Sequence, residues 1–234
     1  MPLVILDIGP PSPKQLHMVI RGMRNSWESW GRGDSGITPS GNFSLGEADM
    51  RLIKQLIKGG TDHAKVLRQI PVVLDVRAPD FFWRQLREYT VGVVPSDLTM
   101  NSTSQMHTLG RERVTERHID LEDVPLDERE RYLDLVEIAR QRWLEAGKRK
   151  GPTARAWRGL LQLISTGWLY ERTVTTNYQA LRAMYHARRH HRELEWRQWC
   201  AAMELLPLYE LIIWSPQDEE KPAKQEESSH ATGN

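Results

Sequence analysis

The strongest candidate for anion chemistry is a cationic run, His-Ala-Arg-Arg-His-His-Arg, at positions 186–192. It lies in a stretch whose apolar spacing predicts one long helix over residues 178–207. On such a helix Arg188 and Arg192 would share a face. Because a guanidinium fork matches the oxygens of a phosphate, the run is a candidate phosphate site. The alternative is a solvated basic surface balanced by the glutamates that follow it.

A second candidate is the segment Asn-Ser-Thr-Ser-Gln-Met-His at positions 101–107, which is rich in hydroxyl and amide groups. It follows an aromatic stretch that we expect to be a helix with Asp80 as its N-cap. Hydroxyls and amides can hydrogen-bond a base edge, a sugar or a phosphate. The alternative is a capped turn in which Asn101 or Ser102 starts a short helix.

The histidines and the cysteine do not predict a metal site. His63, His107, His190 and His191 match no ligand spacing, and neighbouring histidines on a helix point apart. A single cysteine, Cys200, excludes an internal disulfide and a cysteine-based zinc site. The sequence also has no glycine-rich phosphate loop and no serine nucleophile elbow. We therefore expect no metal.

The elements that must position these groups are mostly helices with a few strands. Alternating apolar residues and β-formers predict strands over 3–9, 72–76 and 168–178. Helical spacing predicts helices over 14–30, 45–60, 80–89, 127–150, 153–165 and 178–207. We expect an α/β (α+β) fold with a small central sheet flanked by long helices. Residues 1–214 would form a single domain, and the polar residues 215–234 a disordered tail.

Composition narrows the class of protein. The chain has 234 residues, of which 27% are charged and 39% apolar, as in soluble globular proteins. A net charge of +1 gives no general reason to expect a nucleic-acid or membrane partner. No apolar run approaches membrane-spanning length, and the N-terminus lacks the pattern of a signal peptide. We expect a cytoplasmic protein with no membrane partner.

Residues 56–86 resemble the central segment of the flavin-dependent thymidylate synthases. In that family a helix and a glycine precede a strand that ends in Ala-Pro, and a helix carrying Arg-Gln follows. The corresponding residues here are Gly59–Gly60, Ala78–Pro79 and Arg84–Gln85. The order of these features is what carries the resemblance.

The resemblance continues downstream, so that it covers roughly residues 50–210 in the same order. Asn101 and Ser104 fall on the asparagine and the second serine of the family signature. Arg158 precedes a short apolar run, as in the family. From Asn177 to Arg188 the spacing matches a family strand and helix that carry a phosphate-binding arginine, without a gap.

The resemblance implies the fold of the thymidylate synthase-complementing proteins and an FAD-dependent methyltransferase of nucleotide biosynthesis. Such an enzyme transfers a one-carbon unit to C5 of dUMP, or of a related pyrimidine nucleotide, with reduced FAD as the hydride donor. Folate and NADPH would be co-substrates. The family builds its sites between the subunits of a tetramer, so a homotetramer is implied.

The resemblance also implies individual roles. Arg158 and Arg188 would clamp the phosphate and polarise the base, while Gln85, Asn101 and Ser104 would bind the nucleotide. Arg188 and Ser104 would take part in catalysis. The residues implied for the flavin are Gln69, Tyr89, Asn177 and His186.

Several positions depart from the family pattern. Glu88–Tyr89–Thr90 or, shifted by one residue, Arg87–Glu88–Tyr89 stands where the family has Arg-His-Arg. Met106–His107 stands in place of Arg-Tyr. Gln69 replaces a histidine, and residues 93–100 look like an insertion. One alternative is therefore a nucleotide-binding relative that has lost flavin chemistry. Another is a nucleic-acid-binding or adaptor protein using a basic helix over 182–197, which the net charge disfavours.

Overall fold

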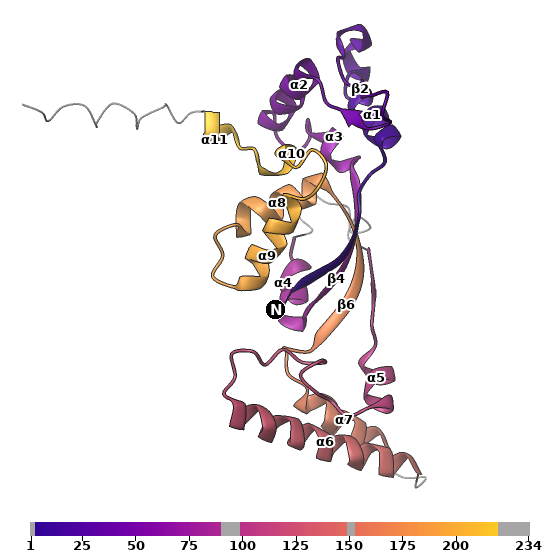
Figure 1. Ribbon diagram of the computed structural model, residues 1–234, viewed down its shortest axis with the longest axis vertical. Coiled ribbons are helices and arrows are strands. Elements are labelled where there is room, and N and C mark those ends of the chain that lie inside the picture. The colour runs from indigo at the N-terminus through magenta and orange to yellow at the C-terminus, as the bar shows by residue number, and fades with distance from the viewer. Residues whose placement is uncertain (1–2, 90–98, 149–152, 220–234) are drawn as a thin grey trace, which may run out of the picture.

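The computed structural model describes residues 3–89, 99–148 and 153–219 (Figure 1). Its centre is a four-stranded sheet in the order β1-β4-β6-β5, in which all neighbouring strands are antiparallel. The strands are β1 (Val4–Gly9), β4 (Pro71–Pro79), β5 (Thr99–Ser102) and β6 (Leu169–Asn177). A short hairpin of β2 (Gly36–Ile37) and β3 (Phe43–Ser44) forms a separate two-stranded sheet. The expected mixed α/β fold with a small sheet is confirmed.

Helices make up most of the remaining described residues. They are α1 (Pro13–Gly22), α2 (Glu47–Lys58), α3 (Lys65–Arg68), α4 (Asp80–Leu86), α5 (Gln105–Arg111), α6 (Leu126–Lys148), α7 (Thr153–Leu163), α8 (Tyr178–Arg188), α9 (Leu194–Met203), α10 (Glu210–Ile213) and α11 (Pro216–Glu219). Two 3-10 turns, at Asn25–Trp27 and Trp30–Arg32, follow α1.

Side-chain alternation on the long central strands determines which face of the sheet is covered. On β4, Val72, Leu74 and Val76 are buried, whereas Val73 between them is exposed. The buried face packs against α4, α8 and α9, which lie on one side of the sheet (Figure 1). Tryptophans supply much of this core, including Trp83, Trp196 and Trp199. These three of the nine tryptophans in the sequence therefore serve packing.

A second core lies at the far end of the sheet, where α5, α6 and α7 gather (Figure 1). Val136 of α6 and Leu160 of α7 are completely buried there, next to Leu109 and Trp168. The Tyr132 hydroxyl donates to the Leu163 carbonyl at 3.1 Å and so links α6 to α7. The fold thus has two helical groups connected by the sheet.

Three expectations about helix ends are wrong. The helix expected over 14–30 ends at Gly22, and two 3-10 turns follow it. Pro79, not Asp80, occupies the N-cap position of α4; Asp80 is the first helical residue, and its carboxylate pairs with Arg84 at 2.7 Å. The helix expected over 178–207 is two helices, because α8 ends at Arg188 and α9 begins at Leu194. Arg188 and Arg192 therefore do not share a helical face, and no continuous basic helix spans 182–197.

The polar segment 101–107 also differs from the expected turn. Its first two residues belong to β5, and α5 starts at Gln105 with Ser104 in the N-cap position. At the C-terminus, the predicted tail begins with the short helix α11, and its remainder, 220–234, lies outside the described residues. Thr90 and most of the presumed insertion, 93–98, also lie outside them.

Candidate functional site

Three of the predicted ligand-binding residues lie together where α4 and α8 end. The Nε atom of Arg188 donates to the Tyr89 hydroxyl, and the guanidinium lies 5.3 Å from the Tyr89 ring centroid and 4.9 Å from that of Trp196. Gln85 accepts a hydrogen bond from the Trp196 indole at 2.7 Å. Its amide nitrogen donates to the Glu193 carboxylate at 2.9 Å. The structure therefore groups Gln85, Tyr89 and Arg188, and their polar atoms bond to one another or to neighbours.

Two of the residues expected near a flavin, Gln69 and Asn177, lie at the C-terminal end of β6. Asn177 is buried and caps α8, because its Oδ1 accepts from the Ala180 amide at 3.0 Å. Gln69 is exposed at the end of α3, close to this cap, since the Tyr178 amide donates to the Ile70 carbonyl at 3.1 Å. The structure brings Gln69 and Asn177 to the same end of the sheet.

His186 lies two turns along α8 from this cap. Its Nε2 is buried and has no hydrogen-bond partner. Burial lowers the pKa of His186, and the neighbouring Arg182 and Arg189 lower it further. Both effects favour the neutral form of the imidazole.

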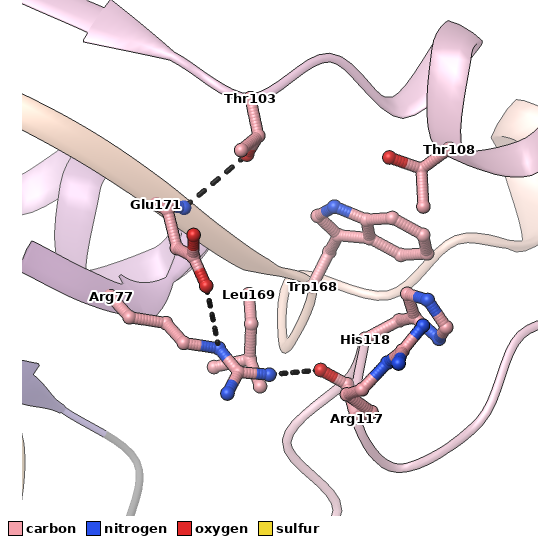
Figure 2. A pocket seen from close by; sticks show the side chains of 8 residues that line it. All are labelled: Arg77, Thr103, Thr108, Arg117, His118, Trp168, Leu169 and Glu171. Atoms are coloured by element: carbon pink, nitrogen blue, oxygen red, sulfur yellow. Dashed lines mark hydrogen bonds and ion pairs between the residues drawn. The ribbon is translucent and has the colours of Figure 1, made fainter.

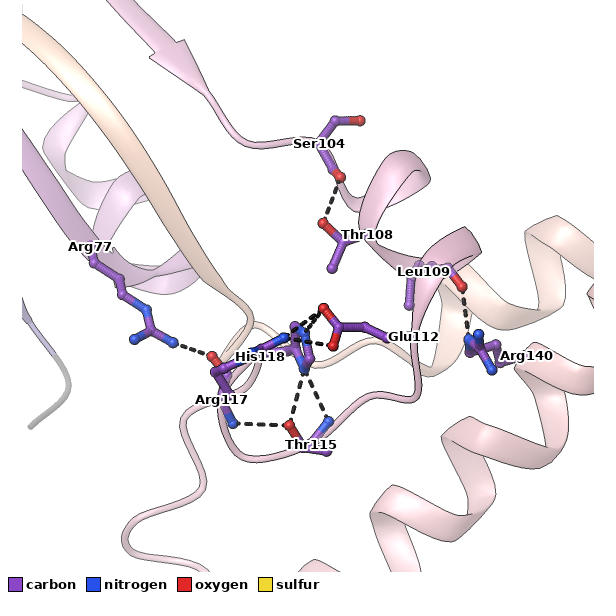
Figure 3. Close-up of polar contacts among 9 residues, drawn as sticks. All are labelled: Arg77, Ser104, Thr108, Leu109, Glu112, Thr115, Arg117, His118 and Arg140. Atoms are coloured by element: carbon purple, nitrogen blue, oxygen red, sulfur yellow. Dashed lines mark hydrogen bonds and ion pairs between the residues drawn. The ribbon is translucent and has the colours of Figure 1, made fainter.

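The remaining nucleotide-binding candidates lie in or beside the second helical group. Asn101 is exposed on β5 opposite Thr173, and Ser104 is exposed before α5. The Ser104 carbonyl accepts the Thr108 hydroxyl at 3.1 Å, but its own side chain caps nothing (Figure 3). Arg158 is exposed on α7. Figure 1 shows α7 beside α6, well separated from α8, so one chain does not bring Arg158 and Arg188 together.

A cavity of about 330 Å³ opens beside this hydroxyl-rich segment (Figure 2). Its lining comprises Arg77, Thr103, Thr108, Arg117, His118, Trp168, Leu169 and Glu171. The Thr103 hydroxyl accepts from the Glu171 amide at 3.3 Å. The Arg77 guanidinium lies 3.8 Å from the Glu171 carboxylate and donates to the Arg117 carbonyl. The cavity therefore offers both charges and hydroxyls to a polar ligand.

One wall of the cavity is a buried histidine held from several sides (Figure 3). The His118 ring stacks on Trp168 at 5.7 Å, and its Nδ1 accepts from the Thr115 amide at 3.1 Å. Its Nε2 lies 3.4 Å from the Glu112 carboxylate, both oxygens of which accept from Arg117 at 2.6 Å. Desolvation of the Glu112 carboxylate raises its pKa, but the neighbouring Arg117 and His118 outweigh this effect and hold that pKa below its ordinary value.

Apart from Thr103, which belongs to the segment 101–107, sequence reasoning did not find these cavity residues. Arg77 and Glu171 sit at alternate strand positions facing away from the core, so strand periodicity could have placed them on one surface. His118 lies in a loop between α5 and α6, and nothing in its local sequence indicates a buried position. No group of three or more metal-ligating side chains occurs within the described ranges.

The arrangement of helices around the sheet is similar to that of solved thymidylate synthases. Thymidylate synthase X (ThyX) from Helicobacter pylori with FAD and dUMP matches with a TM-score of 0.60, covering 90% of this chain and 95% of that one at 12% identity. A second Helicobacter pylori ThyX structure complexed with FAD and dUMP gives a TM-score of 0.55 at 13% identity, covering 90% and 96%.

This chain has the ThyX fold. At so low an identity the likeness shows the fold alone. No protein family model matches the sequence, and no curated protein matches it. Among the residues that the structure describes, none of the helices is long and apolar enough to cross a membrane.

Proposed function

We propose that the chain is a divergent flavin-dependent thymidylate synthase-like enzyme. It would transfer a one-carbon unit from a folate to C5 of dUMP, or of a related pyrimidine nucleotide, with NADPH as reductant. The observation that carries the proposal is the match over nearly the whole length of two ThyX structures that hold FAD and dUMP. The grouping of Gln85, Tyr89 and Arg188 supports it, because the family resemblance assigns ligand roles to all three.

The residues beside the Asn177 cap fit a polar heterocyclic cofactor. Thr176 and Gln179 each have a buried side-chain oxygen, Oγ1 and Oε1, that has no hydrogen-bond partner. A buried acceptor without a hydrogen bond destabilises the protein. A ligand that donates N–H groups to these two oxygens would therefore bind more tightly. FAD carries such groups on its ring systems. Thr176, Gln179 and His186 would hold it, and bound reduced FAD would supply a hydride.

The protein's own residues would bind and orient the pyrimidine. Arg188 is already fixed by Tyr89 and Trp196, so its charge is preorganised beside the Gln85 amide. A guanidinium at the edge of a uracil would stabilise negative charge that develops on the base during the reaction. Ser104 and Asn101 would complete the nucleotide site from a second copy of the chain, since one chain keeps them apart from Arg188.

The direct test is oxidation of NADPH by the purified protein supplied with FAD and folate, with and without dUMP. The proposal predicts oxidation that depends on dUMP and is lost in Arg188→Gln, a variant that keeps a hydrogen bond donor but removes the charge. Oxidation at the same rate without dUMP, or none under any condition, would contradict it.

A nucleotide-binding protein without flavin chemistry is the second candidate. Two observations favour it. The side chains of Gln85 and Arg188 already form hydrogen bonds within one chain. The family's Arg-His-Arg triplet is also absent from residues 87–90. Calorimetry separates the two: dUMP binding with no FAD binding favours this candidate. The nucleic-acid alternative is weakened, because Arg182 and Arg197 donate to main-chain carbonyls of their own chain.

A further inference from the structure

Among the described residues three arginines are buried, and one of these three has no hydrogen-bond or ion-pair partner there. Arg24, Arg140 and Arg172 are 5%, 6% and 8% exposed. Arg24 pairs with the Asp49 carboxylate at 2.6 Å. Arg140 donates to the Leu109 carbonyl at 2.8 Å and pairs with Glu137 at 3.1 Å. The Arg172 side chain makes no hydrogen bond or ion pair with any described residue, and its Nε is buried without a partner.

Aromatic rings surround the Arg172 guanidinium instead. Its central carbon lies 4.6 Å from the Tyr170 ring centroid and 4.8 Å from that of Trp83. Rings at this distance attract the positive charge, but they do not accept the in-plane N–H bonds of a guanidinium as an oxyanion does. Trp83 is itself fixed, because its indole donates to the Ala78 carbonyl at 2.9 Å. The rings therefore orient the cation and leave its donors unused.

A second guanidinium, that of Arg87, adds positive charge near Arg172. Burial lowers the pKa of Arg172, and the nearby Arg87 lowers it further. Arg87 is exposed just after α4 and has no ion-pair partner among the described residues. Asp80 is the acidic group nearby that favours the charged form, but its carboxylate pairs with Arg84 at 2.7 Å. The guanidinium groups of Arg172 and Arg87 thus have no anionic partner in the described part of the chain.

The positions of Arg172 and Arg87 indicate which ligand they could bind. Arg172 lies opposite Ser102 of β5 and faces the sheet surface that α4 covers. Arg87 lies two residues before Tyr89, whose hydroxyl accepts from Arg188. We propose that Arg172, assisted by Arg87, binds a phosphate monoester, and, resting on the proposed function, that this is the phosphate of the pyrimidine nucleotide. Arg188 and Gln85 then remain for the base.

The test is calorimetric titration of the full chain with inorganic phosphate, dUMP and deoxyuridine. The wild type should bind phosphate and dUMP, and deoxyuridine more weakly. Arg172→Gln, which keeps a planar group against the rings, should bind phosphate and dUMP about tenfold or more weakly, because charge-assisted bonds are lost. The matched control is Arg140→Gln, which removes a buried but fully bonded arginine and should leave both affinities unchanged.

The outcomes separate this proposal from the function on which it rests. Unchanged phosphate and dUMP affinity in Arg172→Gln overturns the phosphate site and leaves the proposed function standing. Phosphate binding that depends on Arg172, with no dUMP binding, supports the site and removes the nucleotide. No binding of phosphate or dUMP to the wild type overturns the site. If Arg172→Gln does not fold, the exposed Arg87→Gln decides: it should weaken phosphate binding severalfold, and an unchanged affinity overturns the proposal.

Discussion

Gln85 links α4 to the start of α9 through one side chain. Its oxygen accepts from the completely buried Trp196 of α9, and its nitrogen donates to Glu193 just before that helix. The family resemblance identified Gln85 as a ligand residue from its place after Arg84, but nothing in the sequence indicated that Trp196 would be its partner. A contact over 111 positions depends on how the helices pack, which local spacing does not encode.

We predict that Gln85→Leu destabilises the protein by about 1–3 kcal/mol, because a buried indole N–H and a partly buried carboxylate both lose their partner. Chemical denaturation measures the change. Gln55→Leu, at an exposed position of α2, is the matched control and should alter stability little. Equal stability of the two variants would show that the Gln85 network contributes nothing.

The Glu112 carboxylate makes stability depend on pH. Its folded pKa lies below the ordinary 4.5, so its stabilising contribution is present above that value and is lost as pH falls through the folded pKa. Glu112→Gln should therefore lower the melting temperature at pH 7 but not at a pH well below 4.5. Glu128→Gln, exposed on α6, should change it at neither pH. A Glu112→Gln deficit that is the same at both pH values would contradict this.

At the scale of elements, strong periodicity was a reliable guide. The alternation at Val72, Leu74 and Val76 predicted β4, and the amphipathic run after Asp127 predicted α6. The break between α8 and α9 was not predictable in the same way, because residues 189–193 contain no glycine or proline. It allows Trp196 and Trp199 to pack on Phe82, whose ring lies 4.9 and 5.7 Å from theirs. Packing therefore overrode helix propensity.

Adjacent leucines on α7 test the second helical core. Leu160 is completely buried among α5 and α6 residues, whereas Leu161 is 37% exposed. We predict that Leu160→Ala costs about 2–5 kcal/mol, because it leaves a cavity. Leu161→Ala should cost less than about 1 kcal/mol. Urea unfolding of both variants measures this, and similar losses would mean that α7 does not pack as described.

At the scale of the whole molecule, one chain holds the predicted nucleotide residues in separate places. Arg188 is the last residue of α8 and Gln85 lies in α4. Ser104 precedes α5 and Arg158 lies in α7, and these two helices are at the far end of the sheet (Figure 1). The sequence indicated which residues carry the resemblance, but it contained no information on how far apart one chain would keep them. The proposed function therefore requires that another copy of the chain contribute to each site.

We predict that the protein is a homo-oligomer, with the exposed apolar residues of α6 as one contact. Leu135 and Ile138 are one turn apart and about half exposed. Light scattering after gel filtration should give a multiple of 27.2 kDa, and Ile138→Glu should reduce it. A wild-type mass of 27.2 kDa at micromolar concentration would leave Arg158 and Ser104 unable to join Arg188.

The most direct test of flavin-dependent chemistry is the visible absorbance spectrum of the purified protein after incubation with FAD and gel filtration. We predict that a flavin band elutes with the protein and that added dUMP perturbs it, because the proposed hydride transfer requires the nucleotide to lie against the flavin. Protein that elutes colourless, with all the FAD in the small-molecule fraction, would contradict the central claim.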